Sequence, residues 1–205
     1  MGLFDKHSEA QTLEELKAEW AGCQQCPLWV QRTQVVMGAG ANPTVIFAVG
    51  QAPGNKEDEE GIPFIGEGGQ ESRTQFDLIG VPAHEVFWTN ALACKPLKGL
   101  SIRDAWVQHC WDRLEAELRI TRPKMIVAMG RPATARFIRK LPAKGVVHGQ
   151  RFTYEGIPGV TTVHPAALLR TRDDRSKRGT EKDLRDDFVL VKELYGRVRA
   201  QTPIA

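Results

Sequence analysis

Four short apolar runs recur along the chain, and each is rich in β-branched or aromatic residues. They read TVIFAVG (44–50), EVFWTNA (85–91), KMIVAMG (124–130) and GVTTVHP (159–165). Near-continuous apolar character of this kind is typical of strands that are covered on both faces, as in a parallel sheet. The pattern therefore predicts four buried strands.

Amphipathic segments lie between these runs and are expected to be helical. They cover residues 69–80, 102–120, 131–141 and 182–200. A further helix is expected in the N-terminal region, residues 1–20, because Thr12 and Glu15 have the spacing of a capping box. The alternation predicts an α/β fold with a central, mainly parallel four-stranded sheet, and we expect residues 1–205 to form a single domain.

The segment 170–183 (RTRDDRSKRGTEKD) interrupts this alternation with six basic and four acidic residues. We expect a charged, solvated loop there.

Polar residues stand at the ends of three predicted strands. Gln51, Asn90 and His164 each fall at or just beyond the carboxyl end of an apolar run. In open parallel sheets, ligands bind at that edge. Taken singly, Asn90 would more often be a turn or helix-cap residue, and His164 a buried histidine that is satisfied by its surroundings. Their shared position indicates a binding site.

Composition narrows the class of protein. The 205 residues carry a net charge of +3, so an anionic partner has to be met by a local basic patch. No apolar run approaches the roughly 20 residues that are needed to span a bilayer. The N-terminus lacks the apolar core of a secretory signal, and we expect a cytoplasmic protein without membrane contact. We also expect a monomer.

The loop GQAPGNKEDEEGIPFIG (50–66) is the most unusual local stretch. Gly50 and Gly54 permit close backbone approach, and Pro53 makes the turn rigid. Such a loop suits a ligand that contacts the backbone. A plain surface turn is the alternative, since an isolated glycine-rich loop is weak evidence of binding.

The four cysteines form a second candidate site. Cys23 and Cys26 make a C-x-x-C pair, and Cys94 and Cys110 follow later in the chain. In an intracellular chain this set indicates a four-thiolate metal site more than disulfides, although free cysteines are often simply buried. The spacing does not distinguish zinc from an iron–sulfur cluster, and a redox C-x-x-C is a lesser option.

Several motifs in order resemble the family 4 uracil-DNA glycosylases, the iron–sulfur branch of the uracil-DNA glycosylase superfamily. The family pattern is C-x-x-C, then G-E-A-P-G-x-x-E-D-x-x-G-x-P-F-V-G, then T-N-x-x-K-C-R-P, a fourth Cys in a helix, and H-P-x-x-L-L-R. Here these read CQQC, GQAPGNKEDEEGIPFIG, TNALACKP, Cys110 in WVQHCWDRL, and HPAALLR. The resemblance covers roughly residues 20–195 and implies the three-layer α/β/α fold of that superfamily.

The resemblance implies a role for each matching residue in removing uracil from DNA. Phe64 would stack on a flipped base beside the turn Gly50-Gln51-Ala52, Asn90 would read the base edge, and His164 would bind the carbonyl oxygen that becomes negative. The four cysteines would hold a [4Fe–4S] cluster. Leu168, Leu169 and Arg170 would lie on the loop that enters the duplex at the lesion, and the DNA partner is expected to be single- or double-stranded. The candidates for phosphate contacts are Lys95, Arg170, Arg172, Arg175, Lys177 and Arg178.

Gln51 departs from the family pattern, which has Glu at this position. A glutamine cannot accept a proton, so strong general-base catalysis from this turn is not expected. Three hypotheses remain: uracil excision with Gln51 orienting the water, excision of another modified pyrimidine, and binding of damaged DNA without turnover. Glu57 and Asp58 keep the family's acidic pair and are expected to support the loop, with Asp58 near the site as an alternative.

Overall fold

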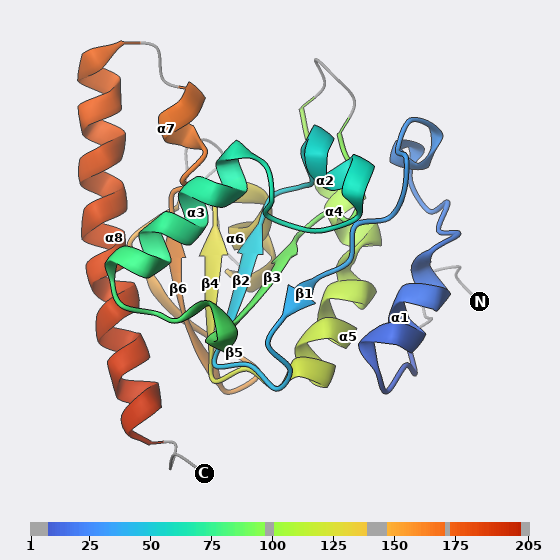
Figure 1. The fold of residues 1–205 in the computed structure, drawn as a ribbon, viewed down its shortest axis with the longest axis horizontal. Coiled ribbons are helices and arrows are strands. Elements are labelled where there is room, and N and C mark those ends of the chain that lie inside the picture. The colour runs from blue at the N-terminus through green and yellow to red at the C-terminus, as the bar shows by residue number, and fades with distance from the viewer. Residues whose placement is uncertain (1–7, 97–100, 139–146, 171–172, 202–205) are drawn as a thin grey trace.

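The computed structural model describes residues 8–96, 101–138, 147–170 and 173–201. The strands of these ranges form one sheet (Figure 1), in the order β1 (Ala39–Gly40), β3 (Val86–Asn90), β2 (Ile46–Gly50), β4 (Met125–Met129), β6 (Ile157–Thr162) and β5 (Arg151–Tyr154). The middle four strands are parallel, whereas β1 and β5 pair antiparallel at the two edges. The four predicted parallel strands are confirmed, and two short edge strands enlarge the sheet to six.

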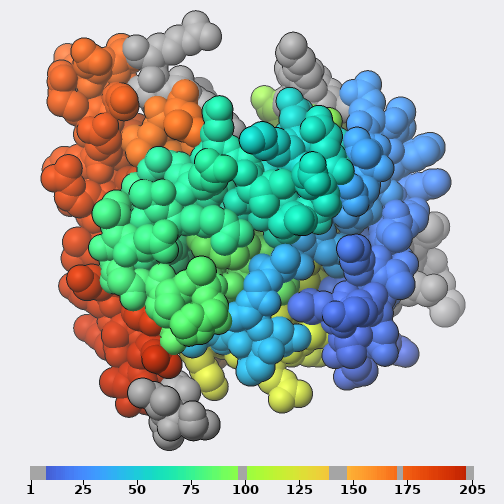
Figure 2. All heavy atoms as spheres, in the orientation of Figure 1, coloured from blue at the N-terminus to red at the C-terminus, as the bar shows by residue number. Residues whose placement is uncertain are grey.

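Helices cover both faces of the sheet, which gives the expected three layers. Helices α3 (Glu67–Leu78) and α8 (Asp174–Ala200) lie on one face, and α5 (Trp111–Thr121) and α6 (Arg131–Phe137) lie on the other. In the view of Figure 2, α3 forms much of the near surface and α8 runs along one side. The remaining helical elements are α1 (Leu13–Trp20), η1 (Pro27–Val30), α2 (Asn55–Glu60), η2 (Ala83–Glu85), α4 (Asp104–His109) and α7 (Ala167–Arg170). No helix in the described ranges is long and apolar enough to cross a membrane.

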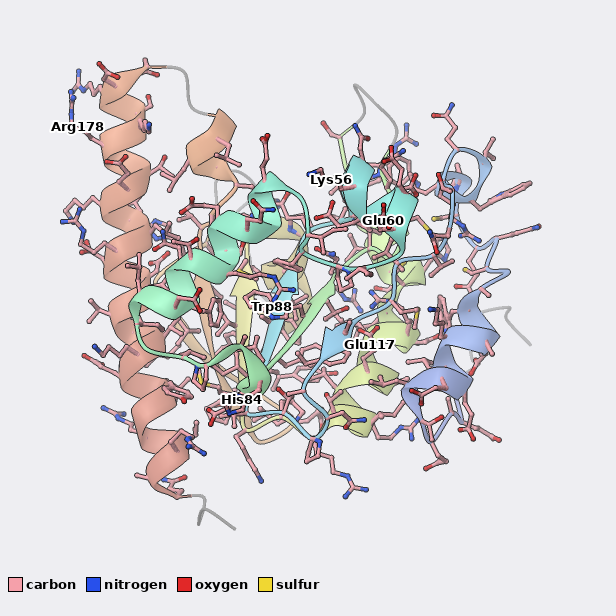
Figure 3. The ribbon with its side chains drawn as sticks, viewed as in Figure 1. Lys56, Glu60, His84, Trp88, Glu117 and Arg178 are labelled. Carbon is pink, nitrogen blue, oxygen red and sulfur yellow. The ribbon has the colours of Figure 1, made fainter. Side chains whose placement is uncertain are left out.

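Neighbouring residues of β3 show how the two faces differ, because successive strand residues point to opposite sides of a sheet. Trp88 points toward α3, where its ring meets Phe76 edge-on at 5.0 Å between centroids. Thr89 points toward α5 and donates a hydrogen bond of 2.6 Å to the Glu117 carboxylate. Figure 3 labels Trp88 and Glu117. One face is thus apolar beneath α3, and the other contains a buried charged group.

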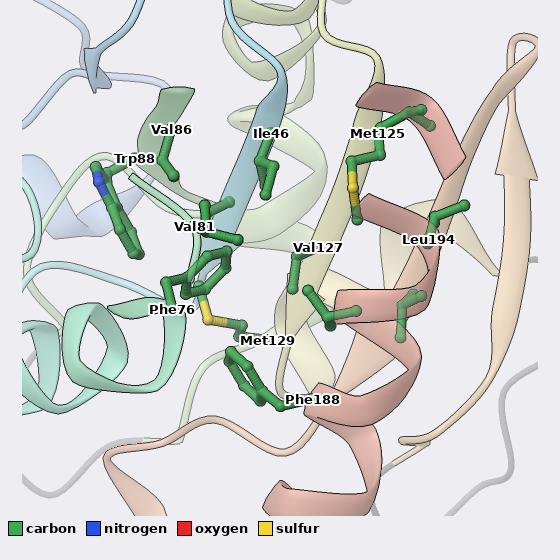
Figure 4. Close-up of a cluster of buried hydrophobic side chains, with 14 of the residues drawn as sticks. Ile46, Phe76, Val81, Val86, Trp88, Met125, Val127, Met129, Phe188 and Leu194 are labelled. Carbon is green, nitrogen blue, oxygen red and sulfur yellow. The ribbon is translucent and has the colours of Figure 1, made fainter. Parts of the chain in front are cut away.

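The apolar core on the α3 and α8 side is drawn in Figure 4. Strand residues such as Ile46 and Val127 meet Phe76 of α3 and Phe188 of α8. Fully burying one side chain of this size contributes about 1.5–3 kcal/mol. This core fixes α8 against the sheet, next to the strand that leads to His164.

The N-terminal capping box is confirmed. The hydroxyl of Thr12 accepts a hydrogen bond from the backbone N–H of Glu15, and the Glu15 carboxylate accepts one from the N–H of Thr12. Helix α1 accordingly begins at Leu13. Residues 1–7 of the expected N-terminal region lie outside the described residues.

The prediction of a charged loop over 170–183 is wrong for most of its length. Asp173 caps a helix by accepting a hydrogen bond of 2.9 Å from the backbone N–H of Ser176, and α8 begins at Asp174. An ion pair between Lys182 and Asp186, one turn apart, supports the exposed face. The buried stripe that begins at Leu184 then anchors the helix to the core. Residues 174–183 of the charged segment are therefore the first part of α8.

Candidate active site and cysteine site

A cleft of about 950 Å³ opens at the carboxyl ends of the parallel strands. Gln51 follows β2, Asn90 ends β3, and His164 follows β6. All of the predicted base-binding side chains line this cleft, together with residues from α2, α3 and α6: Gln51, Ala52, Phe64, Asn90 and His164. The fold thus brings together, from three separate stretches, the residues that the resemblance singles out.

Gly50 is the point at which three of these side chains converge. A Cβ atom on Gly50 would stand 2.5 Å from Oδ1 of Asn90, 2.7 Å from Cζ of Phe64 and 3.2 Å from Nε2 of His164. Gly50 lies directly opposite Asn90 in the parallel pairing of β2 and β3. The missing side chain therefore leaves the room in which an amide, an aromatic ring and an imidazole face one another.

The backbone after β6 fixes the protonation pattern of His164. Nδ1 of His164 accepts a hydrogen bond of 3.2 Å from the backbone N–H of Ala166. The carbonyl oxygen of His164 accepts another, of 2.8 Å, from the N–H of Ala167. A neutral imidazole carries one N–H, so a ring that accepts at Nδ1 donates from Nε2. Nε2 is the atom that faces the space above Gly50.

Phe64 is held in an unusual backbone conformation. Its φ is +60°, and its carbonyl oxygen accepts a hydrogen bond of 3.1 Å from Nε of Arg73. A Cβ on Gly69 would meet the Phe64 backbone at 2.3 Å, so only a glycine allows α3 to approach so closely. Left-handed φ is uncommon for a bulky residue and occurs where the surroundings impose it. The Phe64 ring lies nearly parallel to the imidazole of His164, with 11° between the planes and 6.4 Å between the centroids.

Gln51 reaches across the end of β4. A Cβ on Gly130 would lie 2.3 Å from Nε2 of Gln51 and 3.2 Å from Cβ of His164. Gly130 has a φ of +80°, a conformation that glycine adopts without strain. The glycine thus makes room for the half-buried Gln51 amide beside the catalytic candidate His164.

The acidic pair Glu57 and Asp58 supports the loop. The Glu57 carboxylate accepts hydrogen bonds from the backbone N–H groups of Gly54 and Gly66, and so joins the two ends of the segment between them. Asp58 is fully buried, pairs with Lys95 at 2.8 Å and accepts two hydrogen bonds from Thr33. Burial by itself would raise the pKa of Asp58, but the bonds from Lys95 and Thr33 outweigh it and hold this pKa below its ordinary value.

The residues expected to contact DNA separate into distinct environments. Leu169 is 52 % exposed and lines the cleft. Leu168 is partly buried and packs against Leu184 and Phe188 in a groove of about 440 Å³. Lys95 is engaged by Asp58. Arg170 ends α7, and Arg172 lies outside the described residues.

Two cations of the cleft were not among the expected site residues. Lys56 lies in α2 and Arg131 at the start of α6, and both line the cleft. Arg131 follows the third apolar run directly, so the rule that identifies Gln51 and His164 would also have identified it. Lys56 stands among acidic residues in the sequence NKEDEE, so no basic cluster in the sequence indicates it.

The four cysteines line one cavity on the α1 side of the molecule. Cys23 and Cys26 lie between α1 and η1, Cys94 follows β3, and Cys110 separates α4 from α5. The predicted helix over 102–120 is therefore interrupted at Cys110. All four are free thiols, and three of them are buried: Cys26, Cys94 and Cys110.

Burial sets the protonation of these thiols. It raises the pKa of Cys110 to about 12, and it also raises the pKa values of Cys26 and Cys94. A guanidinium N–H of Arg32 opposes this at Cys94, because it donates a hydrogen bond of 3.1 Å to the sulfur. Thiolates at this position require positive charge nearby, which bound metal would supply. Four thiols from three segments are a suitable ligand set for a four-thiolate site.

Comparison with known proteins agrees with this geometry. The family model described as "Uracil DNA glycosylase superfamily" matches residues 37–186. A type-4 uracil-DNA glycosylase of Sulfurisphaera tokodaii is 32 % identical over 193 residues, which cover 89 % of this chain and 84 % of the relative. Type-4 uracil-DNA glycosylases of Archaeoglobus fulgidus and Thermotoga maritima are 31 % and 30 % identical, over 91 % and 83 % of this chain and 95 % and 90 % of theirs. The chain therefore belongs to the uracil DNA glycosylase superfamily, in its type-4 branch.

Proposed function

We propose that this protein removes uracil from DNA by hydrolysing the N-glycosidic bond, which leaves an abasic site. The observation that carries the proposal is the convergence of Asn90, Phe64 and His164 above Gly50. The relatives named above are uracil-DNA glycosylases by name, and this chain matches them over most of its length. The arrangement suits a planar base with hydrogen-bonding groups along its edge.

The reaction begins with extrusion of the base from the stack, because an enzyme cannot reach its glycosidic bond inside the duplex. Phe64 offers a ring on which the base stacks. The Asn90 amide provides a donor and an acceptor for a pyrimidine edge that carries a carbonyl and an N–H. A base of the size of thymine, or one that carries an exocyclic group, would have to fit beside the same three side chains.

Bond cleavage gives the sugar an oxocarbenium character and leaves negative charge on the base. Nε2–H of His164 is aimed at the space where a base carbonyl would lie, and it can donate to that oxygen as the charge grows. Donors that are already oriented toward developing charge contribute much of the acceleration in such reactions. A water molecule then attacks the anomeric carbon, its oxygen replaces the base, and the base leaves with a proton.

In our proposal, the side-chain amide of Gln51 is the one that lies closest to the attacking water. It orients the water but does not take its proton, so catalysis rests on stabilisation of the leaving base. The loss of a general base is compatible with turnover, since such a group typically contributes about 10²–10⁴-fold. Gln51 is also the observation that favours a second candidate function, excision of a different modified pyrimidine.

The four cysteines are proposed to hold a [4Fe–4S] cluster of structural role. In the described part of the chain, no three His, Cys, Asp or Glu side chains form a group that could hold a metal ion as they stand. The proposal rests on the four thiols that share one cavity and on the order of the cysteine motifs, which is that of the iron–sulfur branch. Four irons per chain and absorption near about 400 nm are the expected readouts.

The phosphate contacts are proposed to come from the cleft and from the start of α8. Lys56 and Arg131 line the cleft, and α8 carries Arg175, Lys177 and Arg178 on its first turns. Arg178 projects away from the body of the molecule (Figure 3). Leu169 lines the cleft and is exposed, and we propose that it fills the gap left by an extruded base.

Base release measured by mass spectrometry tests the proposal. The wild type is incubated with oligonucleotides that contain uracil or one of several modified pyrimidines, in single and double strands, beside Asn90→Ala. Release of uracil by the wild type and a much slower but measurable release by the variant are expected. If only another base is released, that base and not uracil is the substrate. Tight binding with no release of any base would indicate a non-catalytic binder.

A further inference from the structure

Arg113 is an arginine buried completely in the α5 side of the core. Its Nη1 pairs with the Glu117 carboxylate at 2.8 Å, one turn along the same helix, and donates to the Thr89 hydroxyl at 3.0 Å. Glu117 is fully buried as well. Arginine and glutamate are almost never buried to this extent unless they are paired, as these two are. Because neither side chain is solvated, we look for a structural role for the pair.

The second nitrogen of the guanidinium holds the backbone of the base-reading strand. Nη2 donates to the carbonyl oxygen of Asn90 at 2.5 Å and to that of Ala91 at 3.3 Å. The N–H groups of the same two peptide units are also held, because Ala91 donates to the Gly50 carbonyl and Leu92 to the Gln51 carbonyl. Both peptide groups that follow Asn90 are therefore fixed at their two ends.

A short edge strand explains why a side chain is needed there. Strand β1 pairs with β3 only at Phe87 and Trp88. At the carboxyl end of β3, the guanidinium of Arg113 takes the place of a neighbouring strand for the carbonyls of Asn90 and of Ala91, the residue that follows. Glu117 completes the arrangement by accepting a hydrogen bond of 2.8 Å from the backbone N–H of Gly38, just before β1. A buried carbonyl left without a donor would lose its hydration with nothing in exchange, which destabilises the fold.

We propose that Arg113 is a positioning residue for Asn90, and that its hydrogen bonds to the backbone of residues 90 and 91 set where the Asn90 amide stands above Gly50. This rests on the proposed function of Asn90 in reading the base. Glu117 neutralises the guanidinium at short range, so the contribution is geometrical and not a general positive potential at the base. A displacement of about 1 Å at a reacting group can cost about 10²-fold in rate.

A double-mutant cycle with Asn90 tests the proposal. Arg113→Lys keeps the positive charge, but the lysine ammonium lacks the planar guanidinium fork that contacts both carbonyls and Glu117 at the same time. In the wild-type background we expect kcat for uracil release to fall about 10–100-fold, with KM for DNA changed less than about twofold. In the Asn90→Ala background the same substitution is expected to change kcat by less than about twofold. An equal loss of kcat in both backgrounds would overturn the proposal.

Leu114→Ala is the matched control for mere destabilisation of α5. Leu114 is the next residue on the helix, is fully buried, and packs in the core with Phe47 and Phe87, away from the cleft. We expect it to lower the unfolding midpoint as much as Arg113→Lys or more while kcat of the folded protein is retained. An equal kcat loss in this control would assign the effect of Arg113 to general stability.

Two further arms keep the test decisive. If Arg113→Lys does not fold, the paired change Arg113→Met with Glu117→Gln removes both buried charges and keeps the shape, and the same coupling to Asn90 is expected. If the wild type releases no uracil, the proposed function fails. The positioning role of Arg113 is then tested by measuring DNA binding. The preference for an oligonucleotide with one uracil over the same sequence with thymine should then fall in Arg113→Lys and not in Leu114→Ala. An unchanged preference in Arg113→Lys would refute the proposal independently.

Discussion

The backbone N–H of Ala166 donates a hydrogen bond of 3.2 Å to Nδ1 of His164, two residues before it. The bond occupies the one nitrogen of the neutral ring that lacks a proton. The other nitrogen, Nε2, is left as a donor toward the space above Gly50. A tight turn of the main chain, made after Pro165, thus determines which proton His164 offers to a ligand.

His164→Ala removes that donor. We expect the single-turnover rate of uracil release to fall about 10²–10³-fold, the usual loss for one donor to developing charge. Binding of uracil DNA should change little, because phosphate contacts come from other residues. His84→Ala is the control, since His84 is exposed in η2, at the end of the sheet far from Lys56 (Figure 3). Equal rates for the two variants would remove His164 from the mechanism.

Gly50→Ala places a methyl group where the base is expected to lie. The new Cβ would stand 2.5 Å from Oδ1 of Asn90 and 2.7 Å from Cζ of Phe64, so these side chains have to move. We expect base release to fall at least about 10²-fold, as for a misplaced reacting group. Gly196→Ala, in α8 with nothing near its Cβ, should leave the rate unchanged and stabilise the fold by about 0.4–1 kcal/mol. Retained base release in Gly50→Ala would show that the base binds elsewhere.

Gln51→Glu restores the acid that the family pattern has at this position. If deprotonation of water limits the rate, release of uracil should accelerate, by up to about 10²-fold for an added general base. The substrate panel measured for wild type and variant separates rate from specificity. A slower variant that also loses a modified base would instead assign Gln51 to base recognition.

Leu168 and Leu169 are neighbours with different surroundings, and their alanine variants should differ accordingly. Leu169→Ala is expected to lower the rate on double-stranded uracil DNA on the order of tenfold, because the gap left by the extruded base is no longer filled. The rate on single strands should stay the same. Leu168→Ala is expected to lower the free energy of unfolding by about 2 kcal/mol through lost packing on α8, at an unchanged ratio of the two rates. The reverse assignment would make Leu168 the inserted residue.

The ion pair of Asp58 and Lys95 predicts a pH-dependent stability. The pKa of Asp58 is lowered in the folded protein, so its contribution is complete above the unfolded value of about 3.9 and is lost as pH falls through the folded pKa. Asp58→Asn should lower the free energy of unfolding at pH 7 by about 1–3 kcal/mol, since it leaves Lys95 without its partner. Urea unfolding of both proteins from pH 7 to pH 3 should show the difference shrinking toward acid. A difference that stays constant would exclude Asp58 as its source.

The sequence predicts the parts of this fold that depend on local pattern. The four buried strands follow from apolar runs, and the positions of Gln51, Asn90 and His164 at one rim follow from strand ends. Phe64 differs, since it is buried as a core aromatic would be, and its role came from the family motif alone. The left-handed backbone that orients it depends on the approach of Gly69, which no local pattern shows.

Other features depend on contacts between distant segments. Arg113 lies in an amphipathic helix where an arginine would ordinarily face water, and its carbonyl partners are more than twenty residues away. Strands β1 and β5 are short, β1 is exposed and β5 is partly exposed, so neither has the apolar run of a buried strand. The start of α8 is predictable in part from the sequence, because Asp173 caps the helix by accepting a hydrogen bond from the backbone N–H of Ser176. The many charged residues of this segment nevertheless made a loop the simpler prediction.

The continuous course of α8 from Asp174 to Ala200 changes what DNA binding would cost in conformational entropy. Cations on a solvated loop lose backbone freedom, about 1–2 kcal/mol for each ordered residue, when they settle on phosphates. On a helix already anchored to the core by Phe188 and Val191, the backbone of Arg175 and Arg178 is ordered beforehand, and only side-chain freedom remains to be lost. From Asp174 onward, the charged segment therefore presents its cations from helical backbone positions whose spacing is already set in the free protein.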